Sequence, residues 1–151
     1  MRVLVKIGVL VEKEGHLLLI REWSERRRGY FWNIVKGTLD NPEEGVLQCA
    51  VRECVEETGA QVSVRGVASI FYSKAKRVQI NLLANFVRKV LPIKPLRKQK
   101  GEEIIETKWV SRGESQRMKG KEFINKRSFI AVRLWARGVS APLDVLREID
   151  G

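Results

Sequence analysis

Three glutamates in the first half of the chain have the spacing and chemistry of a metal site. Glu53, Glu56 and Glu57 stand at i, i+3 and i+4, so on a helix their carboxylates share one face. Like charges at this spacing repel each other and weaken an isolated helix. A hard divalent cation would remove the repulsion, and Mg²⁺ prefers oxygen ligands from a few carboxylates together with substrate phosphates. The alternative is a solvated acidic helix face, which is common in soluble proteins.

The residues around these glutamates predict the helix that must position them. We expect a helix over residues 46 to 58, with Gly59 just past its end, where glycine is a natural residue. Its apolar side is supplied by Val46, Leu47, Cys49, Ala50, Val51, Cys54 and Val55. The helix therefore has one side for a core and one side for chemistry.

Residues 37 to 60 resemble the Nudix box, the signature G-x5-E-x7-R-E-U-x-E-E-x-G-U, in which U is a bulky apolar residue. Glu44 and the run from residue 52 to residue 60, R-E-C-V-E-E-T-G-A, match in register. Gly37 precedes Glu44 by one residue more than the signature has, whereas Glu43 lies one residue too far from the arginine. We interpret Glu44 as the motif glutamate and place an extra residue in the loop that begins at Gly37, because loops absorb insertions more easily than helices.

This resemblance implies a role for each matching residue. The implied metal ligands are the main-chain carbonyl of Gly37 and the carboxylates of Glu53, Glu56 and Glu57. Arg52 would pair with Glu44 and hold the loop against the helix. The cation, Mg²⁺ or alternatively Mn²⁺, would bridge a pyrophosphate, neutralise its charge and activate a water. Glu53 could instead be the general base, and the sequence leaves base and ligand open within a cluster that shares cations. The catalytic candidates in the box are thus Glu44, Arg52, Glu53 and Glu57.

A later stretch, residues 102 to 110, resembles the E-I-x-E-x-x-W-V segment of many Nudix proteins. In several members of the family, a glutamate in this late loop completes the metal site or acts as the base. Glu103 is the first candidate for that role here, followed by Glu102 and Glu106. The alternative is a charged entry into a strand.

Basic and aromatic residues before the box are candidates for substrate binding. Arg21 and Arg28 could hold phosphates, and Trp32 could stack on a base. The alternatives are a solvated loop for the arginines and a core position for the tryptophan. Members of the family that prefer ADP-ribose carry a proline soon after the box, but the first proline after it here is Pro92. We therefore assign no substrate subclass.

The charge of the chain is strongly positive, with a formal net charge of +11 at pH 7. Basic residues cluster at residues 26–28, 74–77, 94–100 and 112–127. No recognised nucleic-acid-binding motif accompanies these clusters. Steering of a phosphate-rich small substrate and a plain charged surface are therefore the first two explanations, and stable binding of RNA is the third.

Apolar patterning predicts the remaining elements. The expected strands cover residues 3–11, 16–21, 30–35, 61–72, 78–90 and 102–110. An apolar stripe predicts a second long helix over residues 123–137. Residues 111–121 are polar and are predicted to be irregular. Pro142 in a first turn predicts a short C-terminal helical extension over residues 140–150.

These elements indicate a single domain over residues 1–151, with its core at about residues 3–137. Strands with one helix in the middle and another near the end define an α/β or α+β fold, a mixed β-sheet flanked by helices. The resemblance sharpens this expectation to the Nudix-type α/β/α sandwich. The longest apolar runs are too short to cross a bilayer, so no membrane partner is expected.

Two function classes follow. The first is a Mg²⁺-dependent hydrolase that cleaves the pyrophosphate linkage of a nucleoside diphosphate joined to another group, such as a nucleoside triphosphate or dinucleoside polyphosphate, by water attack at phosphorus. The alternative is a non-hydrolytic module that binds nucleotide or RNA. The intact set of three glutamates favours the enzyme.

Cys49 and Cys54 lie on different sides of the predicted helix, which indicates reduced thiols and a cytoplasmic protein. A homodimer through the C-terminal residues is left open.

Overall fold

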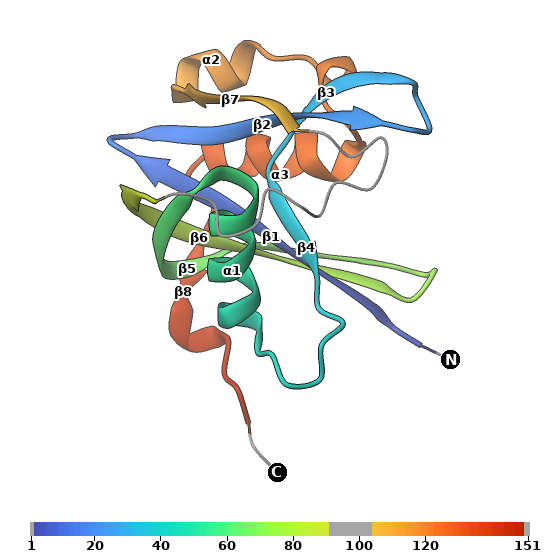
Figure 1. Ribbon diagram of the computed structural model, residues 1–151, viewed down its shortest axis with the longest axis vertical. Coiled ribbons are helices and arrows are strands. Elements are labelled where there is room, and N and C mark those ends of the chain that lie inside the picture. The colour runs from blue at the N-terminus through green and yellow to red at the C-terminus, as the bar shows by residue number, and fades with distance from the viewer. Residues whose placement is uncertain (1, 91–103, 150–151) are drawn as a thin grey trace.

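The computed structural model describes residues 2–90 and 104–149 (Figure 1). Its first two strands, β1 (Leu4–Lys13) and β2 (His16–Ser24), form the hairpin that the apolar pattern predicts. Glu14 and Gly15 have φ angles of 50° and 76° in the turn between them, a conformation typical of two-residue hairpin turns. Both strands extend beyond their predicted ends.

The remaining strands build one mixed sheet around this hairpin. They are β3 (Gly29–Asn33), β4 (Val35–Thr38), β5 (Ala60–Ser73), β6 (Arg77–Lys89), β7 (Ile104–Val110) and β8 (Ala141–Pro142). The order along the sheet is β3-β2-β1-β6-β5-β8, with β4 paired to β1 and β7 paired to β2. β1 and β6 run parallel, and the other described pairs are antiparallel. The predicted mixed sheet is confirmed.

The segment predicted as one strand, residues 30–35, is divided between two strands. β3 pairs with β2, with Trp32 opposite Arg21, whereas β4 pairs with β1, with Gly37 opposite Ile7. The chain changes its partner strand at Ile34, which is fully buried. Gly37 consequently lies within a strand, so the prediction that a loop begins at this glycine is wrong.

Helix α1 (Val46–Thr58) has the predicted bounds. It begins after Gly45, whose backbone N–H donates a hydrogen bond of 3.1 Å to Gln48 Oε1. It ends at Gly59, which has a φ angle of 71° and whose N–H donates to carbonyl oxygens of the last turn. The left-handed conformation at this position explains why a glycine follows the helix.

The second long helix, α3 (Lys126–Ala136), is confirmed with shorter bounds than predicted. The side chain of Asn125 caps it, because Oδ1 accepts a hydrogen bond of 2.9 Å from the Ser128 N–H.

Residues 111–121, predicted to be irregular, contain the short helix α2 (Arg112–Arg117) and the start of the 3₁₀ turn η1 (Gly120–Glu122). At α2, Ser111 Oγ accepts from the Glu114 N–H at 3.1 Å, and Glu114 Oε1 accepts from the Ser111 N–H at 3.3 Å. This reciprocal capping box stabilises a helix that has little apolar patterning of its own.

The predicted helix over residues 140–150 is wrong. Residues Ala141 and Pro142 form β8 against β5, opposite Val67 and Gly66, and a 3₁₀ turn, η2 (Leu143–Val145), follows. Proline is tolerated in an edge strand because no neighbouring strand needs its missing N–H. Pairing with the edge strand β5 therefore outweighs the local sequence pattern, which resembles the start of a helix.

The two helices α1 and α3 cover opposite faces of the strands (Figure 1). One buried cluster joins β1, β2 and β6 to Cys49, Ala50 and Cys54 of α1. The other joins alternate residues of the same strands to Ala131, Val132 and Trp135 of α3. This arrangement confirms the predicted α/β/α sandwich. In the described part of the chain, no helix has the length and apolar character needed to cross a membrane.

Candidate active site

The side chain of Arg52 holds the loop before α1 against the helix. Its Nε donates to Glu44 Oε2 at 2.6 Å and its Nη2 donates to Glu44 Oε1 at 2.8 Å. This is the two-point contact between a guanidinium and a carboxylate that gives both strength and fixed geometry. Glu44, and not its exposed neighbour Glu43, forms the contact, as the chosen register of the motif predicts.

Arg52 also contacts two of the three clustered glutamates. Its Nη1 donates to Glu53 Oε1 at 2.8 Å and to Glu56 Oε2 at 3.0 Å. Hydrogen bonding to Glu44, followed by the charge of Glu53, raises the pKa of Arg52 above its ordinary value against the opposing effect of burial. The arginine therefore stays charged and offsets part of the repulsion among the carboxylates.

Although Glu53 is the more buried residue of the cluster, Glu57 carries a buried carboxylate oxygen. Burial raises the pKa of this carboxyl well above its ordinary value, and the charges of Glu53 and Glu22 add to the effect, while the backbone N–H of Lys36 opposes it. Its Oε2 atom is buried and has no hydrogen-bond partner among the described residues. A buried oxygen without a partner is costly and points to a ligand that would complete it.

Gly37 brings strand β4 close to this cluster. A Cβ atom at this position would lie 2.6 Å from Glu53 Oε1 and 2.5 Å from Glu53 Cδ. No side chain fits there without displacing the glutamate, which explains the glycine sterically. The close approach places the main chain of β4 beside the carboxylates of α1.

The donor set fits a hard divalent cation in kind. It consists of carboxylate oxygens and a neighbouring main-chain strand, and one buried oxygen lacks a partner. Among residues 2–90 and 104–149, however, no three histidine, cysteine, aspartate or glutamate side chains are arranged so that they could already hold a metal ion. Arg52 engages Glu53 and Glu56 instead. Binding of a cation therefore requires these carboxylates to turn away from the arginine.

A chain of buried polar groups that the sequence interpretation missed lies next to the cluster. Asn33 Nδ2 donates to Glu22 Oε1 at 2.5 Å, Ser128 Oγ donates to Asn33 Oδ1, and Lys36 Nζ donates to Ser128 Oγ at 3.4 Å. The chain joins β2, β3, β4 and the first turn of α3. The only local signal in the sequence is that polar residues interrupt apolar strand segments directly before Gly37.

Lys36 has an unusual electrostatic environment at the end of this series of hydrogen-bonded side chains. Burial, reinforced by the positive charge of Arg127, lowers the pKa of Lys36 to about 8, although Glu22 and Glu57 act in the opposite direction. Lys36 is thus a half-buried amine close to two carboxylates.

The predicted substrate residues lie elsewhere. Arg21 and Trp32 are together, with the guanidinium 5.8 Å from the ring centroid, but Trp32 packs on the core cluster of the α3 face. Arg21 also pairs with Glu106 through Nη1 and Oε1 at 3.5 Å. Arg28 lies in the β2–β3 turn, with a φ angle of 53°. Glu103 and its neighbour Glu102 lie outside the described residues.

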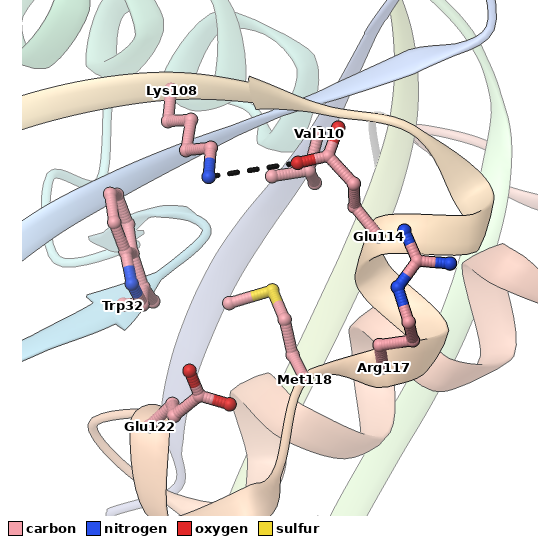
Figure 2. Close-up of a pocket in the computed structure, with 7 residues that line it drawn as sticks. All are labelled: Trp32, Lys108, Val110, Glu114, Arg117, Met118 and Glu122. Carbon is pink, nitrogen blue, oxygen red and sulfur yellow. Dashed lines mark ion pairs between the residues drawn. The ribbon is translucent and has the colours of Figure 1, made fainter.

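Figure 2 shows the residues around a cavity beside Trp32, on the α3 side of the sheet. The volume of this cavity is about 320 Å³. Its other lining residues are Lys108, Val110, Glu114, Arg117, Met118 and Glu122. Lys108 Nζ and Glu114 Oε2 form an ion pair of 3.6 Å across it, and Glu122 Oε2 accepts from the Lys119 N–H at 2.6 Å. Its carboxylates are thus engaged within the protein.

The chain belongs to the NUDIX domain family, because the family pattern matches residues 2–131. This assignment confirms the resemblance carried by the glutamate-rich helix, and it confirms the predicted class, a Nudix-type pyrophosphohydrolase.

Solved structures of low sequence identity share the fold. A NUDIX hydrolase from Nitrosomonas europaea has a TM-score of 0.77 at 24% identity, over 99% of each chain. An ADP compounds hydrolase has a TM-score of 0.67 at 20% identity, over 89% of this chain and 74% of that chain. The E. coli ORF135 protein has a TM-score of 0.64 at 17% identity, over 99% of this chain and 96% of that chain. A search of curated proteins found no match.

Proposed function

We propose that this protein is a divalent-cation-dependent pyrophosphohydrolase of nucleoside diphosphate derivatives. The observation that carries the proposal is the pair Glu53 and Glu57: Glu57 has a buried oxygen that is unpartnered among the described residues, and the neighbouring Glu53 lies against the glycine of β4. Such an arrangement is unfavourable for the protein alone and is relieved by a bound cation.

Each residue of the cluster has a role in this proposal. Mg²⁺, or Mn²⁺ in its place, would be held by Glu53, Glu56, Glu57 and the Gly37 carbonyl. Once bound, such a cation neutralises pyrophosphate charge and lowers the pKa of a coordinated water. Arg52 and Glu44 keep the loop and the helix in register. Glu103, outside the described residues, is proposed to complete the site or to act as the base.

The substrate is proposed to be a nucleotide with a pyrophosphate linkage, such as a nucleoside triphosphate or a dinucleoside polyphosphate. The half-buried amine of Lys36 and the charge of Arg127 provide cationic groups near the glutamate cluster. The ADP compounds hydrolase shares the fold only, and the chain lacks an early proline after the box. The proposal therefore names no single nucleotide.

Release of phosphate or pyrophosphate from a panel of substrates tests the proposal. The panel contains nucleoside triphosphates, ADP-ribose, dinucleoside polyphosphates and capped RNA, each with and without Mg²⁺. Glu56→Gln serves as the inactive variant, and Glu43→Gln serves as the matched control because Glu43 is exposed and outside the Arg52 contact. We expect turnover that requires both the metal and Glu56 and that survives in the control.

The proposal would be contradicted if Glu56→Gln turned over substrate as fast as the wild-type protein, or if a chelator left the turnover of the wild-type protein unchanged. The protein could instead turn over no substrate of the panel while Mg²⁺ still raises its melting temperature. This result would favour the alternative, a non-hydrolytic binding module. The thermal measurement separates these outcomes because it reports metal binding without turnover.

A further inference from the structure

A second cavity, of about 300 Å³, lies where two distant segments of the chain meet. One segment is the β2–β3 turn and the other runs from η1 into the first turns of α3. The lining residues are Arg26, Arg27, Gly120, Lys121, Phe123, Ile124, Asn125, Lys126 and Phe129. The basic clusters at residues 26–28 and 112–127, which are far apart in the sequence, are thus brought together.

Arg27 holds the two segments together and so builds the cavity. Its Nη1 donates to the Phe123 carbonyl oxygen at 2.5 Å and its Nη2 donates to the Lys121 carbonyl oxygen at 3.1 Å. Its guanidinium carbon lies 3.8 Å from the centroid of the Phe31 ring. With two carbonyls and an aromatic face as partners, this arginine is a wall of the cavity.

The other cations of the cavity face solvent. Arg26, Lys121 and Lys126 are exposed, and none of the described carboxylates lines the cavity. The nearest acidic residues in the sequence are engaged: Glu25 Oε2 accepts from Trp23 Nε1 at 3.2 Å, and Glu122 accepts from a backbone N–H. In the cavity of Figure 2, by contrast, lysine and glutamate neutralise each other. Of these two cavities, both built from described residues, the second presents positive charge without a lining carboxylate.

An apolar surface accompanies this charge. Phe129 and Ile124 line the same cavity and are partly exposed, and the Phe129 ring packs on Phe123 with centroids 5.5 Å apart. Cations that contact phosphate, next to an aromatic side chain on which a base can stack, are the combination used to bind single strands. A cavity at the lower end of the small-molecule range admits about one nucleotide and excludes a duplex.

We propose that this cavity is a binding site for single-stranded nucleic acid, with Arg26, Lys121 and Lys126 on the phosphates and Phe129 under a base. The proposal is independent of hydrolysis. The first turn of α3 connects the two regions, because Lys126 lines the cavity and Ser128 accepts a hydrogen bond of 3.4 Å from Lys36 Nζ.

Fluorescence anisotropy with a labelled oligouridine of about 10 nucleotides, in chelator, tests this proposal. Lys121→Glu and Lys126→Glu are compared with Lys74→Glu, which makes the same change in net charge in the β5–β6 turn. This turn lies apart from both segments (Figure 1). All three residues are exposed, and melting temperatures verify folding. We expect each cavity variant to bind the oligonucleotide about tenfold more weakly than the wild-type protein and with a lower salt dependence. Lys74→Glu should weaken binding by about twofold or less.

Equal losses in all three variants would overturn the proposal, because they would show a general effect of net charge. Equal affinity for a duplex of the same length would overturn the single-strand assignment. The chelator prevents metal-dependent turnover, so the binding measurement does not depend on hydrolysis. Absence of oligonucleotide binding would leave the hydrolase proposal intact, and absence of hydrolysis would leave the binding proposal intact.

Discussion

Glu57 shows how one buried carboxyl links stability to chemistry. Its pKa is raised above the ordinary value of 4.5 in the folded protein by burial and by Glu53. A raised folded-state pKa means that the folded protein holds the proton more tightly than the unfolded chain. The stabilisation is therefore fully present below about pH 4.5 and is lost as the pH rises through the folded-state pKa.

We predict that Glu57→Gln removes this pH-dependent loss. Above about pH 5, the metal-free variant should gain melting temperature relative to the wild-type protein, because a neutral amide replaces a carboxyl that must ionise while buried. Thermal unfolding in chelator from pH 4 to pH 9 measures the difference, with Glu43→Gln as the control. A constant difference across this range would show that Glu57 does not titrate within it. In the presence of Mg²⁺ the variant should lose turnover by about a hundredfold or more.

Several contacts at the residue scale follow from the sequence, and others do not. The pairing of Arg52 with Glu44 is implied by the motif, because both residues belong to one loop and the helix that follows it. The chain from Glu22 through Asn33 and Ser128 to Lys36 could not be predicted in this way. It exists only because separate strands and α3 converge, and their convergence is a property of the whole fold.

At the scale of elements, the separation between β4 and α1 governs the candidate site. We predict that Gly37→Ala destabilises the protein by about 1–3 kcal/mol, because the added methyl group would overlap the Glu53 carboxyl. Urea unfolding measures this loss, and turnover should fall with it because Glu53 is displaced. Gly15→Ala is the comparison variant, since nothing lies within 4 Å of its added Cβ; its positive φ still carries a cost of about 1 kcal/mol.

An unfolding free energy for Gly37→Ala equal to that of the wild-type protein would show that β4 can move away from α1. The glycine would then have no steric role.

The helix α2 provides a second prediction at this scale. Ser111→Ala should cost about 1 kcal/mol of unfolding free energy, because it leaves the Glu114 N–H without its side-chain acceptor. Ser63→Ala, at an exposed position in β5, is the control. An equal effect of the two substitutions in urea unfolding would mean that the capping box does not stabilise α2.

Elements were predictable where the local pattern and the tertiary environment agree. The bounds of α1 follow from its apolar side and from Gly59, whose left-handed conformation ends the helix. The division of residues 30–35 at Ile34 was not predictable, because strand-forming residues lie on both sides of it and only the two partner strands define the change. Pro142 was misinterpreted because a proline suits both a first helical turn and a sheet edge.

The whole molecule carries a net charge of +11, which should act on its encounters with anionic substrates. We predict that kcat/KM for a nucleotide substrate falls severalfold between about 50 and 500 mM salt, while kcat changes less, because screening shortens the reach of the positive field. Steady-state kinetics at constant Mg²⁺ measure this dependence. A kcat/KM that does not change with salt would show that the net charge solvates the surface and does not steer the substrate.

The central parallel pair of strands sets the order of events when the chain first folds. Leu4 pairs with Arg77 and Glu12 pairs with Asn85, so β1 gains its parallel partner only after β6 is available. Closing so large a loop is entropically costly, and proteins dominated by such pairings fold in milliseconds to seconds. During synthesis, the apolar strand β1 therefore waits, with only its hairpin and β4 as earlier partners, until β6 has emerged from the ribosome.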